Sequence, residues 1–600
     1  MKLKIIFYDQ KILWNKSWIF LGSSYSNLKH AENQLKGKRI GIDRVLHESF
    51  KEELKNYLEW NENQRIKFED STYWWMSDLS GRNNAITKLF LYICQISSLK
   101  KILKTTNEDE ILLVSDDIFL IEAIKNNFSE YKIKRNNLIT FKIIKNFLFH
   151  HFKVVRNLLI IILSFLFSYC CSRITLRKKE YPSGNVYLLH QFIDINSLRS
   201  SGSIESRYFP FLKEYFKKKN LNLYSLPWFE VFWSGKIKTF KKLRKDNYLI
   251  VEDWLNIFDY YRSIKNFFKA SLCFNIRAKY PNIDIKYLIL REKRVYKENI
   301  VSNLGFWNYM PVLKKWSKNC ESLTCIDHYE NMIYEHALIA AVKNIKKKTR
   351  ICGYHHTLFS NEFTAWHSLE SEWKSNLKPD CIISLGPVSK KMLVSQGIPN
   401  ERIIDGPALR FKNILSKEKN FVKKNKKNIL IPLPQNIDVS IELIDKTKKL
   451  AEELKDTEYN FVIKLHPNFE TSKILSLLGL AKLPKNLVIS DENISNLLNN
   501  HLIVICMGSG AVYDAALNGN IVFSLKSEIN LMNNCLDIFR GNFKFLDSHS
   551  LKSIKNVLLE FIHNGQELDK YIKEFEKLKL YLVNNINLVN EKSLSTFELN

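Results

Sequence analysis

The chain has 600 residues, of which 45% are apolar and 26% charged, with a formal net charge of +29 at pH 7. This composition is typical of a globular protein of two or three domains. The positive charge would suit a nucleic-acid partner, but the lysines are spread over the whole chain without zinc-finger spacing, an RNP-like motif or a basic heptad region. We therefore expect no nucleic-acid partner.

The cysteines and the N-terminus both indicate a cytosolic protein. None of the ten cysteines forms a CxxC pair, and several, such as Cys325 and Cys506, fall in or beside apolar strands. Reduced and buried thiols have this pattern. The apolar run in residues 1–8 is too short for a signal peptide, and no small-residue cleavage site follows it.

Residues 1–140 predict a small α/β unit. An apolar strand at 111–117 is followed by a helical pattern. The aromatic cluster at 73–79, Tyr-Trp-Trp-Met-Ser-Asp-Leu, is expected to pack in the interior.

Residues 141–180 predict a membrane-associated helical segment. Residues 158–171 form a run of fourteen residues without a charge, and basic residues lie on both sides of it, among them Lys153, Arg156 and Arg173. A spanning helix needs about 20 apolar residues, so a helix or shallow hairpin in the membrane interface fits better. A buried helix that links two domains and a true span are the alternatives.

The rest of the chain predicts two doubly wound α/β domains, at 181–424 and 425–585, with a tail at 586–600. Strands are expected at 186–190, 248–251, 323–327, 351–354 and 382–385. A lysine-rich hinge is expected at 412–427. After it, strands begin at Ile429, Phe461, Leu487, Leu502 and Ile521, and residues 566–582 form an amphipathic helix. The prediction is therefore two Rossmann-like domains that face each other across a cleft.

Two loops of the 425–585 domain predict a nucleotide-sugar site. The first holds Lys464, His466 and Pro467, and the second is the turn 508–510, Gly508-Ser509-Gly510, which opens a helix carrying Asp514. Backbone N–H groups at such a turn suit a phosphate. Lys464 and His466 would add charge-assisted donors, and Asp514 would accept from ribose hydroxyls.

Three polar clusters at strand ends of the 181–424 domain predict the acceptor side. They contain Glu205 and Arg207 in the first, Glu330 and Asn331 in the second, and His355 and His356 in the third. Inverting sugar transfer needs a base for the acceptor hydroxyl and cations for the departing phosphate. The candidate bases are Glu205, Glu330 and His356.

Glu330 is favoured as the base because it follows a strand and opens a helix. His356 has the more suitable unperturbed pKa, and Glu205 sits on a loop that could position the acceptor. Substrate contacts are assigned to Asn331, His355 and Arg207.

Structural alternatives accompany these assignments. The two histidines 355–356 could be bonded to backbone at a strand end, and Glu330 could cap a helix. A zinc site built from His328, His336, His355 and His356 lacks an i, i+4 histidine pair. The acidic trio at 108–110 precedes a strand, whereas a metal-chelating motif would follow one, so no metal is expected.

The motifs resemble those of known families. The Lys464-to-Pro467 turn with Gly508-Ser509-Gly510 and Asp514 looks like the donor half of GT-B glycosyltransferases, similar in kind to the bacterial sialyltransferases and Kdo transferases whose His-Pro motif contacts the CMP phosphate. Residues 329–331, 335–339 and 353–357 resemble bacterial surface-carbohydrate biosynthesis proteins of O-antigen and capsule loci. Many GT-B enzymes carry Glu where this chain has Asp514.

The resemblance implies a GT-B fold, a nucleotide-sugar donor such as a CMP-linked sugar, and no resident cofactor. It also implies a lipid-linked acceptor in lipopolysaccharide O-antigen or capsule assembly. We therefore expect an inverting, metal-independent glycosyltransferase on an anionic membrane surface, at the cytoplasmic face of the inner membrane. The alternatives are a polyol-phosphate transferase that uses a CDP-alcohol, a UDP-sugar 2-epimerase, a non-catalytic scaffold of a glycan-assembly complex and a nucleic-acid binder.

Overall fold

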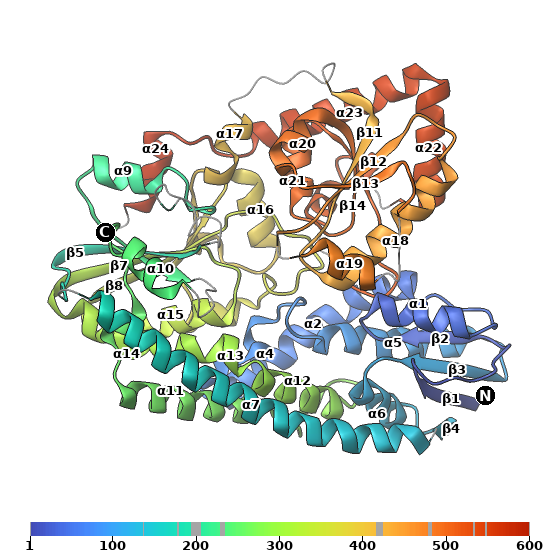
Figure 1. Ribbon diagram of the computed structural model, residues 1–600, viewed down its shortest axis with the longest axis horizontal. Coiled ribbons are helices and arrows are strands. Elements are labelled where there is room, and N and C mark those ends of the chain that lie inside the picture. Colours follow the sequence, from blue (N-terminus) through green and yellow to red (C-terminus); the bar gives the residue numbers. More distant parts are fainter. Residues whose placement is uncertain are drawn as a thin grey trace.

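The structure is a computed structural model, and it describes residues 2–135, 137–176, 179–193, 204, 206–228, 235–415, 424–467, 469–477, 483–531, 534–546 and 549–598. Three parallel sheets of four, six and five strands each form the centre of an α/β unit (Figure 1). We call these the first, second and third units, in chain order. The α/β class, with two doubly wound domains and an N-terminal α/β extension, is therefore confirmed.

The first unit has the strand order β2-β3-β1-β4. The predicted strand at 111–117 is β3, which is buried along nearly its whole length because both faces of a parallel sheet are covered. The predicted aromatic cluster packs as expected, with Trp74 and Trp75 each 1% exposed. The strands are β1 (Lys2–Phe7), β2 (Trp18–Leu21), β3 (Glu110–Ser115) and β4 (Lys132–Arg135). The helices are α1 (Tyr25–Gln34), α2 (Asp43–Lys67), α3 (Thr72–Trp75), α4 (Asp78–Gly81), α5 (Leu89–Thr105) and α6 (Ile118–Asn127).

The second unit has the strand order β10-β9-β8-β7-β5-β6, and the direction of winding reverses between β5 and β7. Ligands of open α/β sheets bind at the carboxyl ends of the strands beside such a reversal. The strands are β5 (Gly184–Phe192), β6 (Asn222–Trp228), β7 (Cys320–Asp327), β8 (Lys348–Tyr354), β9 (Cys381–Ser384) and β10 (Ile403–Asp405). The helices are α9 (Leu212–Lys218), α10 (Lys236–Leu243), α11 (Ile257–Ala270), α12 (Lys286–Glu298), α13 (Ile300–Asn303), α14 (Tyr309–Trp316), α15 (Ile333–Lys343), α16 (Pro387–Ser395) and α17 (Lys412–Leu415).

One predicted strand of the second unit is wrong. Residues 248–251 contribute only a single bridge, between Tyr248 and Ser225, and the chain then turns into the 3-10 helix η1 (Val251–Trp254). The buried carboxylate of Asp253 accepts from Arg244 at 2.7 Å and from Ser172 at 2.5 Å. These bonds stabilise the turn into η1. The apolar pattern of residues 248–251 gives no sign of them, because the partners lie outside that segment.

The third unit has the strand order β13-β12-β11-β14-β15, the Rossmann order 3-2-1-4-5. All five predicted strands are present, and so is the long amphipathic helix, α23. The strands are β11 (Asn425–Pro432), β12 (Asn460–Lys464), β13 (Leu487–Ser490), β14 (His501–Cys506) and β15 (Ile521–Ser524). The helices are α18 (Ile437–Glu453), α19 (Thr471–Leu477), α20 (Ile494–Asn500), α21 (Ala511–Leu517), α22 (Leu551–His563) and α23 (Gly565–Asn584), and the last helix, α24 (Glu591–Leu594), lies against the second unit.

The C-terminal segment returns to the second unit. The backbone N–H of Asn587 donates to the carbonyl of Leu385 at 2.8 Å, and its carbonyl accepts from Ala408 at 2.9 Å. Phe597 is fully buried, with its ring 5.6 Å from that of Tyr354. The two units are thus joined both by this segment and by the lysine-rich connection predicted as a hinge, whose residues 416–423 lie outside the described part.

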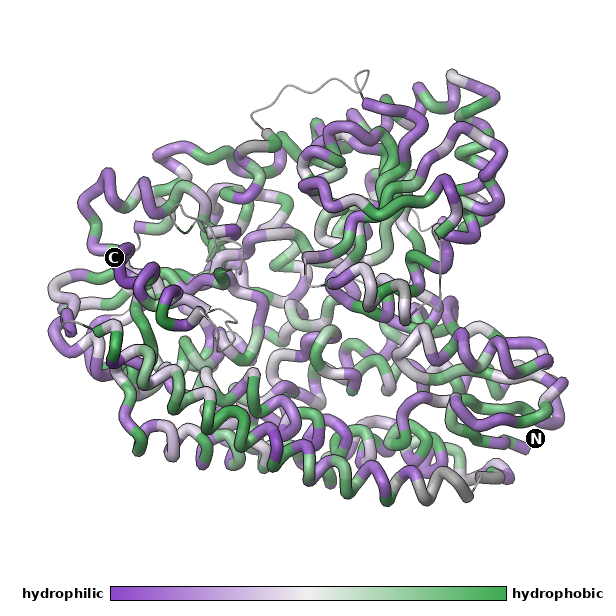
Figure 2. The backbone as a smooth tube through the Cα atoms, in the orientation of Figure 1, coloured by the Kyte–Doolittle hydropathy of each residue, from purple (hydrophilic) through white to green (hydrophobic). Residues whose placement is uncertain are grey.

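A helix of 39 residues, α7 (Asn137–Thr175), contains the predicted apolar run. Among the described residues, its part from residue 144 to 175 is the one helix long and apolar enough to cross a membrane, by length and composition. Only 22% of its most apolar window is buried, so it is not the buried linking helix that was one of the alternatives. In Figure 2 this helix runs along the lower edge of the molecule, and many of its residues have the green of hydrophobic positions.

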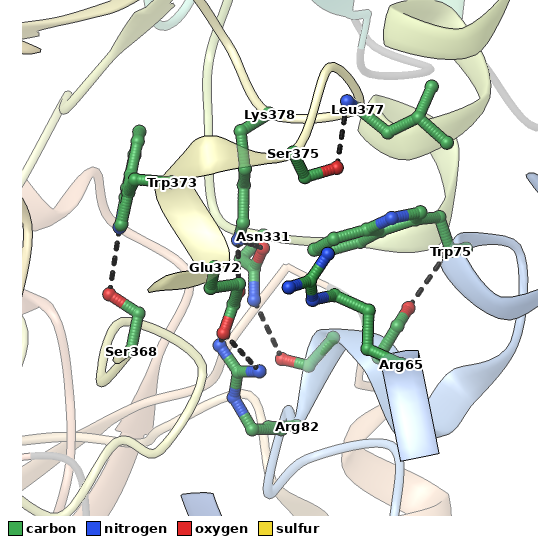
Figure 3. A network of polar contacts seen from close by, with 12 residues as sticks. Arg65, Trp75, Arg82, Asn331, Ser368, Glu372, Trp373, Ser375, Leu377 and Lys378 are labelled. Carbon is green, nitrogen blue, oxygen red and sulfur yellow. Dashed lines mark hydrogen bonds and ion pairs between the residues drawn. The ribbon is translucent and has the colours of Figure 1, made fainter. Parts of the chain in front are cut away.

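A buried network of charges ties the first unit to the second (Figure 3). The guanidinium of Arg82 donates to both oxygens of Glu372, at 2.9 and 3.0 Å, and Lys378 lies 2.5 Å from the same carboxylate. All three side chains are less than 5% exposed. Burial pushes the pKa of Glu372 up, but the two cations outweigh it and lower that pKa to about 2.

We expect Glu372→Gln to lower the free energy of unfolding by about 3–5 kcal/mol, because it leaves two buried cations without their partner. Since the pKa of Glu372 is depressed from 4.5, its stabilisation is complete above pH 4.5 and is lost as the pH falls toward 2. Denaturant unfolding between pH 3 and 7 measures both effects. Glu370→Gln is the control, with an expected change within about 0.5 kcal/mol, because Glu370 is exposed on the 3-10 helix η5 (Glu370–Lys374) that also carries Glu372. Equal effects of the two variants would contradict the assignment.

Candidate functional site

The candidate site lies where the carboxyl edges of the second and third sheets meet. In the second sheet the winding reverses between β5 and β7, and in the third it reverses between β11 and β14. The predicted polar loops follow these strands or their neighbours. Parallel strands carry their loops to one edge, so residues far apart in sequence converge there.

An imidazole–carboxylate pair lies at the edge of the second sheet. His356 Nε2 is 3.2 Å from Glu330 Oε1, and the two side chains are 4% and 23% exposed. Burial raises the pKa of Glu330, but the hydrogen bond and charge of His356, with smaller contributions from His328 and Arg207, hold it below its usual value. Burial is also the largest influence on His356 and lowers its pKa. Two of the three predicted bases thus form a pair in direct contact, and Glu330 is the more accessible of the two.

Glu330 is fixed in place from its own helix and loop. Glu335, in the first turn of α15, accepts from the backbone N–H groups of Glu330 at 2.7 Å and Met332 at 2.8 Å. Between them, Asn331 adopts a φ of 61°, in the left-handed region that few residues other than glycine occupy. Glu335 therefore acts as the cap of α15, which leaves Glu330 free to point away from the helix.

Asn331 has a different role from the predicted substrate contact. Its amide nitrogen donates to the carbonyls of Gly81 and Ala365, at 3.3 and 2.9 Å. Its oxygen accepts from Tyr329 at 2.8 Å and from Lys378 at 3.0 Å. Since both ends of this buried amide are engaged within the protein, we assign it to positioning Glu330.

His355 points away from its neighbour His356. Its Nδ1 lies 2.7 Å from Ser389 Oγ, and its ring meets Trp366 edge to face. The side chain is fully buried, and burial lowers its pKa well below 6.5. Its Nε2 is buried without a hydrogen-bond partner. This burial places His355 behind the exposed edge, where it supports the loop.

A second buried network lies beneath the Glu330 pair. His190 Nδ1 is 2.8 Å from Asp327 Oδ1, and its Nε2 is 3.2 Å from the hydroxyl of Tyr309. His328 lies beside them, with a pKa lowered to about 4, chiefly by burial. Among the described residues, His190, Asp327 and His328 are the one group close enough to hold a metal ion. Both nitrogens of His190 already have partners in the protein, so the group is better described as a hydrogen-bonded network.

The four-histidine zinc site considered from the sequence is not assembled. His336 lies 2.7 Å from the carbonyl of Trp75 and 3.0 Å from Asn331 Oδ1, in the interior next to the first unit. His355 is bonded to Ser389. Only His328 and His356 lie near each other, with ring centroids 6.2 Å apart.

Arg207 and Tyr208 connect the two sheet edges. The Tyr208 ring stacks on His328 at 4.7 Å and meets His356 edge to face at 4.4 Å. Arg207 is exposed, and its charge lowers the pKa both of Glu330 in the second unit and of His466 in the third. A single cation therefore acts on both sides of the site. Sequence reasoning found Arg207 but missed Tyr208, whose signal was only that it follows Arg207. The neighbouring Glu205 lies outside the described residues.

The turn before α21 has the backbone expected of an anion site. Gly508 has a φ of 67°, which L-residues rarely adopt. Gly510 has an ordinary backbone, yet a Cβ placed on it would meet nothing within 4 Å. Ser509, between them, is 4% exposed. The turn is therefore rigid at Gly508 and opens into free space at Gly510.

The loop after β12 supplies less positive charge to the site than the sequence predicted. Burial and the charge of Arg207 lower the pKa of His466 to about 4, so at neutral pH it is an uncharged donor or acceptor rather than a cation. The Lys464 ammonium donates to the carbonyl of Asp491 at 3.1 Å, toward the neighbouring strand β13. Pro467 is exposed in the turn that follows. The positive charge near the turn at 508–510 is therefore supplied largely from the second unit.

Asp514 forms an ion pair with Arg410, which lies on the 3-10 helix η7 (Leu409–Phe411) of the second unit. The side chains are 12% and 19% exposed. Burial raises the pKa of Asp514 despite the nearby charges of Arg410 and Arg207. The predicted ribose contact is thus occupied by an arginine that the sequence did not single out. Its only local signal is the Gly406-Pro407 turn that precedes it.

We expect the Arg410–Asp514 pair to couple the two units by about 0.5–3 kcal/mol, the usual range for side chains in direct contact. A double-mutant cycle of Arg410→Gln and Asp514→Asn, measured by denaturant unfolding, gives this value. The exposed pair Lys427–Glu458, with side chains 59% and 69% exposed, is the control and should couple by less than about 1 kcal/mol. Additive effects at Arg410 and Asp514 would show that the pair does not hold the units together.

Comparison with known proteins gives low-identity structural similarity. No protein-family model matches the chain, and a search of curated proteins finds no match. A UDP-GlcNAc 2-epimerase from Neisseria meningitidis, bound to UDP-GlcNAc, is 14% identical, with a TM-score of 0.37 over 69% of this chain and 97% of that one. The glycosyltransferase SnogD from Streptomyces nogalater is 9% identical, with a TM-score of 0.36 over 70% and 100% of the two chains. A point mutant of S. aureus TarM, in complex with UDP, Fondaparinux and alpha-GlcNAc-glycerol, is 12% identical, with a TM-score of 0.38 over 69% and 99%.

Proposed function

We propose that the protein is an inverting, metal-independent glycosyltransferase that takes a sugar from a nucleotide-activated donor. The proposal rests on one observation. A candidate base on the second unit and a candidate anion-binding turn on the third unit both lie where these two units meet. The Glu330–His356 pair lies on the second unit, where the charge of Arg207 acts on Glu330. Arg410, also of the second unit, pairs with Asp514 on the helix that the Gly508–Gly510 turn opens. A base and an anion site on neighbouring domains are what the transfer of a group from a phosphate to a hydroxyl requires.

The proposed reaction assigns a step to each group. Glu330 accepts the proton of the acceptor hydroxyl while that oxygen attacks the anomeric carbon. The bond from the anomeric carbon to the donor phosphate breaks, and its electrons stay on the phosphate oxygen. Arg207, Arg410 and the backbone N–H groups of the turn stabilise this charge, and neutral His466 adds a hydrogen bond. His356 orients the Glu330 carboxylate through their contact at 3.2 Å.

The acceptor we propose is a lipid-linked precursor of a surface polysaccharide, O-antigen or capsule, and a CMP-linked sugar is one candidate donor. The support is the motif resemblance together with the exposed apolar helix α7. We propose that the protein works at the cytoplasmic face of the inner membrane. A polyol-phosphate transferase using a CDP-alcohol would need the same base and anion site, and so it is the alternative. The two differ in product, because only the alternative moves a phosphate onto the acceptor.

We expect Glu330→Gln to lower turnover by roughly 10²–10⁴-fold while donor affinity stays within a few-fold, since the variant keeps the shape but loses the proton acceptor. Single-turnover assays with donor titration separate the two quantities. His356→Asn should lower turnover less than Glu330→Gln does, because His356 orients the base and does not itself accept the proton. Glu321→Gln, at the exposed opposite end of β7, should have no effect. A Glu330→Gln variant with normal turnover, or one that is inactive because it no longer binds donor, would remove Glu330 from the role of base.

We expect Gly510→Ala to leave folding intact but to weaken nucleotide binding, because its methyl group enters the open space proposed for the phosphate. A thermal-shift panel of CMP, UDP, GDP and CDP identifies the nucleotide, since a ligand at 100 times its Kd stabilises by about 2.7 kcal/mol. Gly508→Ala is the matched variant, and its positive φ should cost about 1–2 kcal/mol of folding stability even without nucleotide. A nucleotide shift that is unchanged in Gly510→Ala would place the phosphate elsewhere.

A further inference from the structure

The long helix α7 has its amphipathic character reversed relative to an ordinary surface helix. Large apolar side chains recur every three or four residues from Leu148 to Leu166 on its exposed side, with Ile174 eight residues further on, and each is 48–70% exposed. They are Leu148, Phe152, Val155, Leu159, Leu163, Leu166 and Ile174. At 1.5 Å per residue this stripe is about 39 Å long. It begins well before the charge-free run at 158–171 that the sequence singled out.

The inward side of α7 carries polar side chains that are bonded to the protein, beside buried apolar ones such as Ile161 and Cys171. Asn157 donates to the carbonyl of Glu298 at 2.8 Å, and Ser172 donates to Asp253 at 2.5 Å. Thr175 accepts from Arg244 at 3.2 Å. The helix is therefore attached to the second unit at its middle and at its C-terminal end. It could cross a bilayer only if these buried bonds were broken.

A second helix, α11, continues the apolar surface. Tyr260 of α11 stacks on Phe165 of α7 with ring centroids 4.5 Å apart, and Figure 1 shows both helices along the same edge of the molecule. On the outer side of α11, Ile257, Phe258 and Tyr261 are 67%, 73% and 65% exposed. The exposed surface is thus shared by two helices that are distant in sequence.

The charges that α7 and α11 themselves expose have one sign, although Lys153 of α7 pairs with Glu298 of α12 at 2.7 Å. Helix α7 contains no Asp or Glu, and the single acidic residue of α11, Asp259, is buried against Lys315 at 2.5 Å. Exposed cations flank the apolar side chains on both helices, namely Lys145, Lys153, Arg156, Arg262, Lys265 and Lys269. A surface with apolar side chains among cations, and without exposed carboxylates, complements an anionic lipid headgroup layer.

We propose that α7 and α11 together form a docking surface for an anionic lipid bilayer, and that they lie in the plane of its interface. The apolar stripe enters the boundary between headgroups and acyl chains, and the cations contact lipid phosphates. The second unit stays in water with its sheet above the membrane. The inference concerns attachment alone and holds whichever reaction the protein catalyses.

Cys170 allows a direct test. It lies in the last turns of α7 and is the one exposed cysteine, whereas the other nine are buried. An environment-sensitive fluorophore on Cys170 of the full chain is titrated with vesicles of phosphatidylcholine alone and with vesicles containing phosphatidylglycerol. We expect a blue shift and at least tenfold tighter partition on the anionic vesicles. A spin label at Cys170 should report a shallow depth, near the glycerol backbone.

Two variants separate the contributions of the two helices. Leu159→Glu/Leu163→Glu on α7 and Phe258→Glu/Tyr261→Glu on α11 should each weaken partition at least tenfold. Leu580→Glu, at a residue 61% exposed on α23, is the control and should change nothing. These variants act on exposed positions, and circular dichroism confirms that they fold.

Three results would overturn the proposal. The first is partition unaffected by the α11 variant, which would remove that helix from the surface. The second is a label that reaches the bilayer centre, which would show a spanning helix. The third is a lipid-free dimer that the α7 variant makes monomeric, without vesicle binding by the original chain, which would show that a second copy covers the face. Vesicle partition is measured without substrate, so a failed activity assay would leave its outcome unchanged.

Discussion

The architecture of the site depends on the left-handed backbone at Asn331. Asparagine adopts the left-handed region more readily than most residues other than glycine. At Asn331, with φ 61°, the conformation is held by its buried amide, which is bonded at both ends, and by Lys378, which is itself paired with Glu372. Through this network the first unit reaches the strand end that carries Glu330. Replacing one member of such a network leaves a buried charge unpaired, which is why its effects reach beyond its own contacts.

The positive charge at the junction of the second and third units is supplied by arginines and not by histidines. Burial removes the charge from the histidines His328, His355 and His466, whose pKa values all lie below 6.5. The remaining positive charge belongs to the arginines, which keep their protons in any protein environment. A site that relies on Arg207 and Arg410 for its anion is insensitive to pH in the neutral range. Its acid limit is set by Glu330, whose pKa His356 holds below the ordinary value.

The second unit has two surfaces of interest, its junction with the third unit and the exposed side of α7 and α11. Each suits one of the two proposed substrates. A sugar donor is soluble and can enter at the junction with the third unit, whereas a lipid-linked acceptor is confined to the membrane. If α7 and α11 rest on the bilayer, the acceptor diffuses in two dimensions toward a protein already attached to the same surface. Attachment by two helices rather than by a spanning segment also leaves the second unit rigid, since the polar side of α7 is part of its packing.

The sequence by itself determined the α/β class, the five strands of the third unit, four of the five strands predicted in the second, and the residues at the strand ends. These follow from apolar periodicity and from the rule that polar loops of parallel strands gather at one edge, both of which are local. The partners were decided only by tertiary structure. Asp514 meets Arg410 across 104 residues, and Asn331 meets Gly81 across 250. The strand predicted at 248–251 does not form, because Asp253 is bonded to residues outside that segment. Whether the apolar run at 158–171 is exposed or buried was decided only by the packing of α7 against the second unit. No local pattern carries such pairings, because they depend on how the three sheets and their helices pack together.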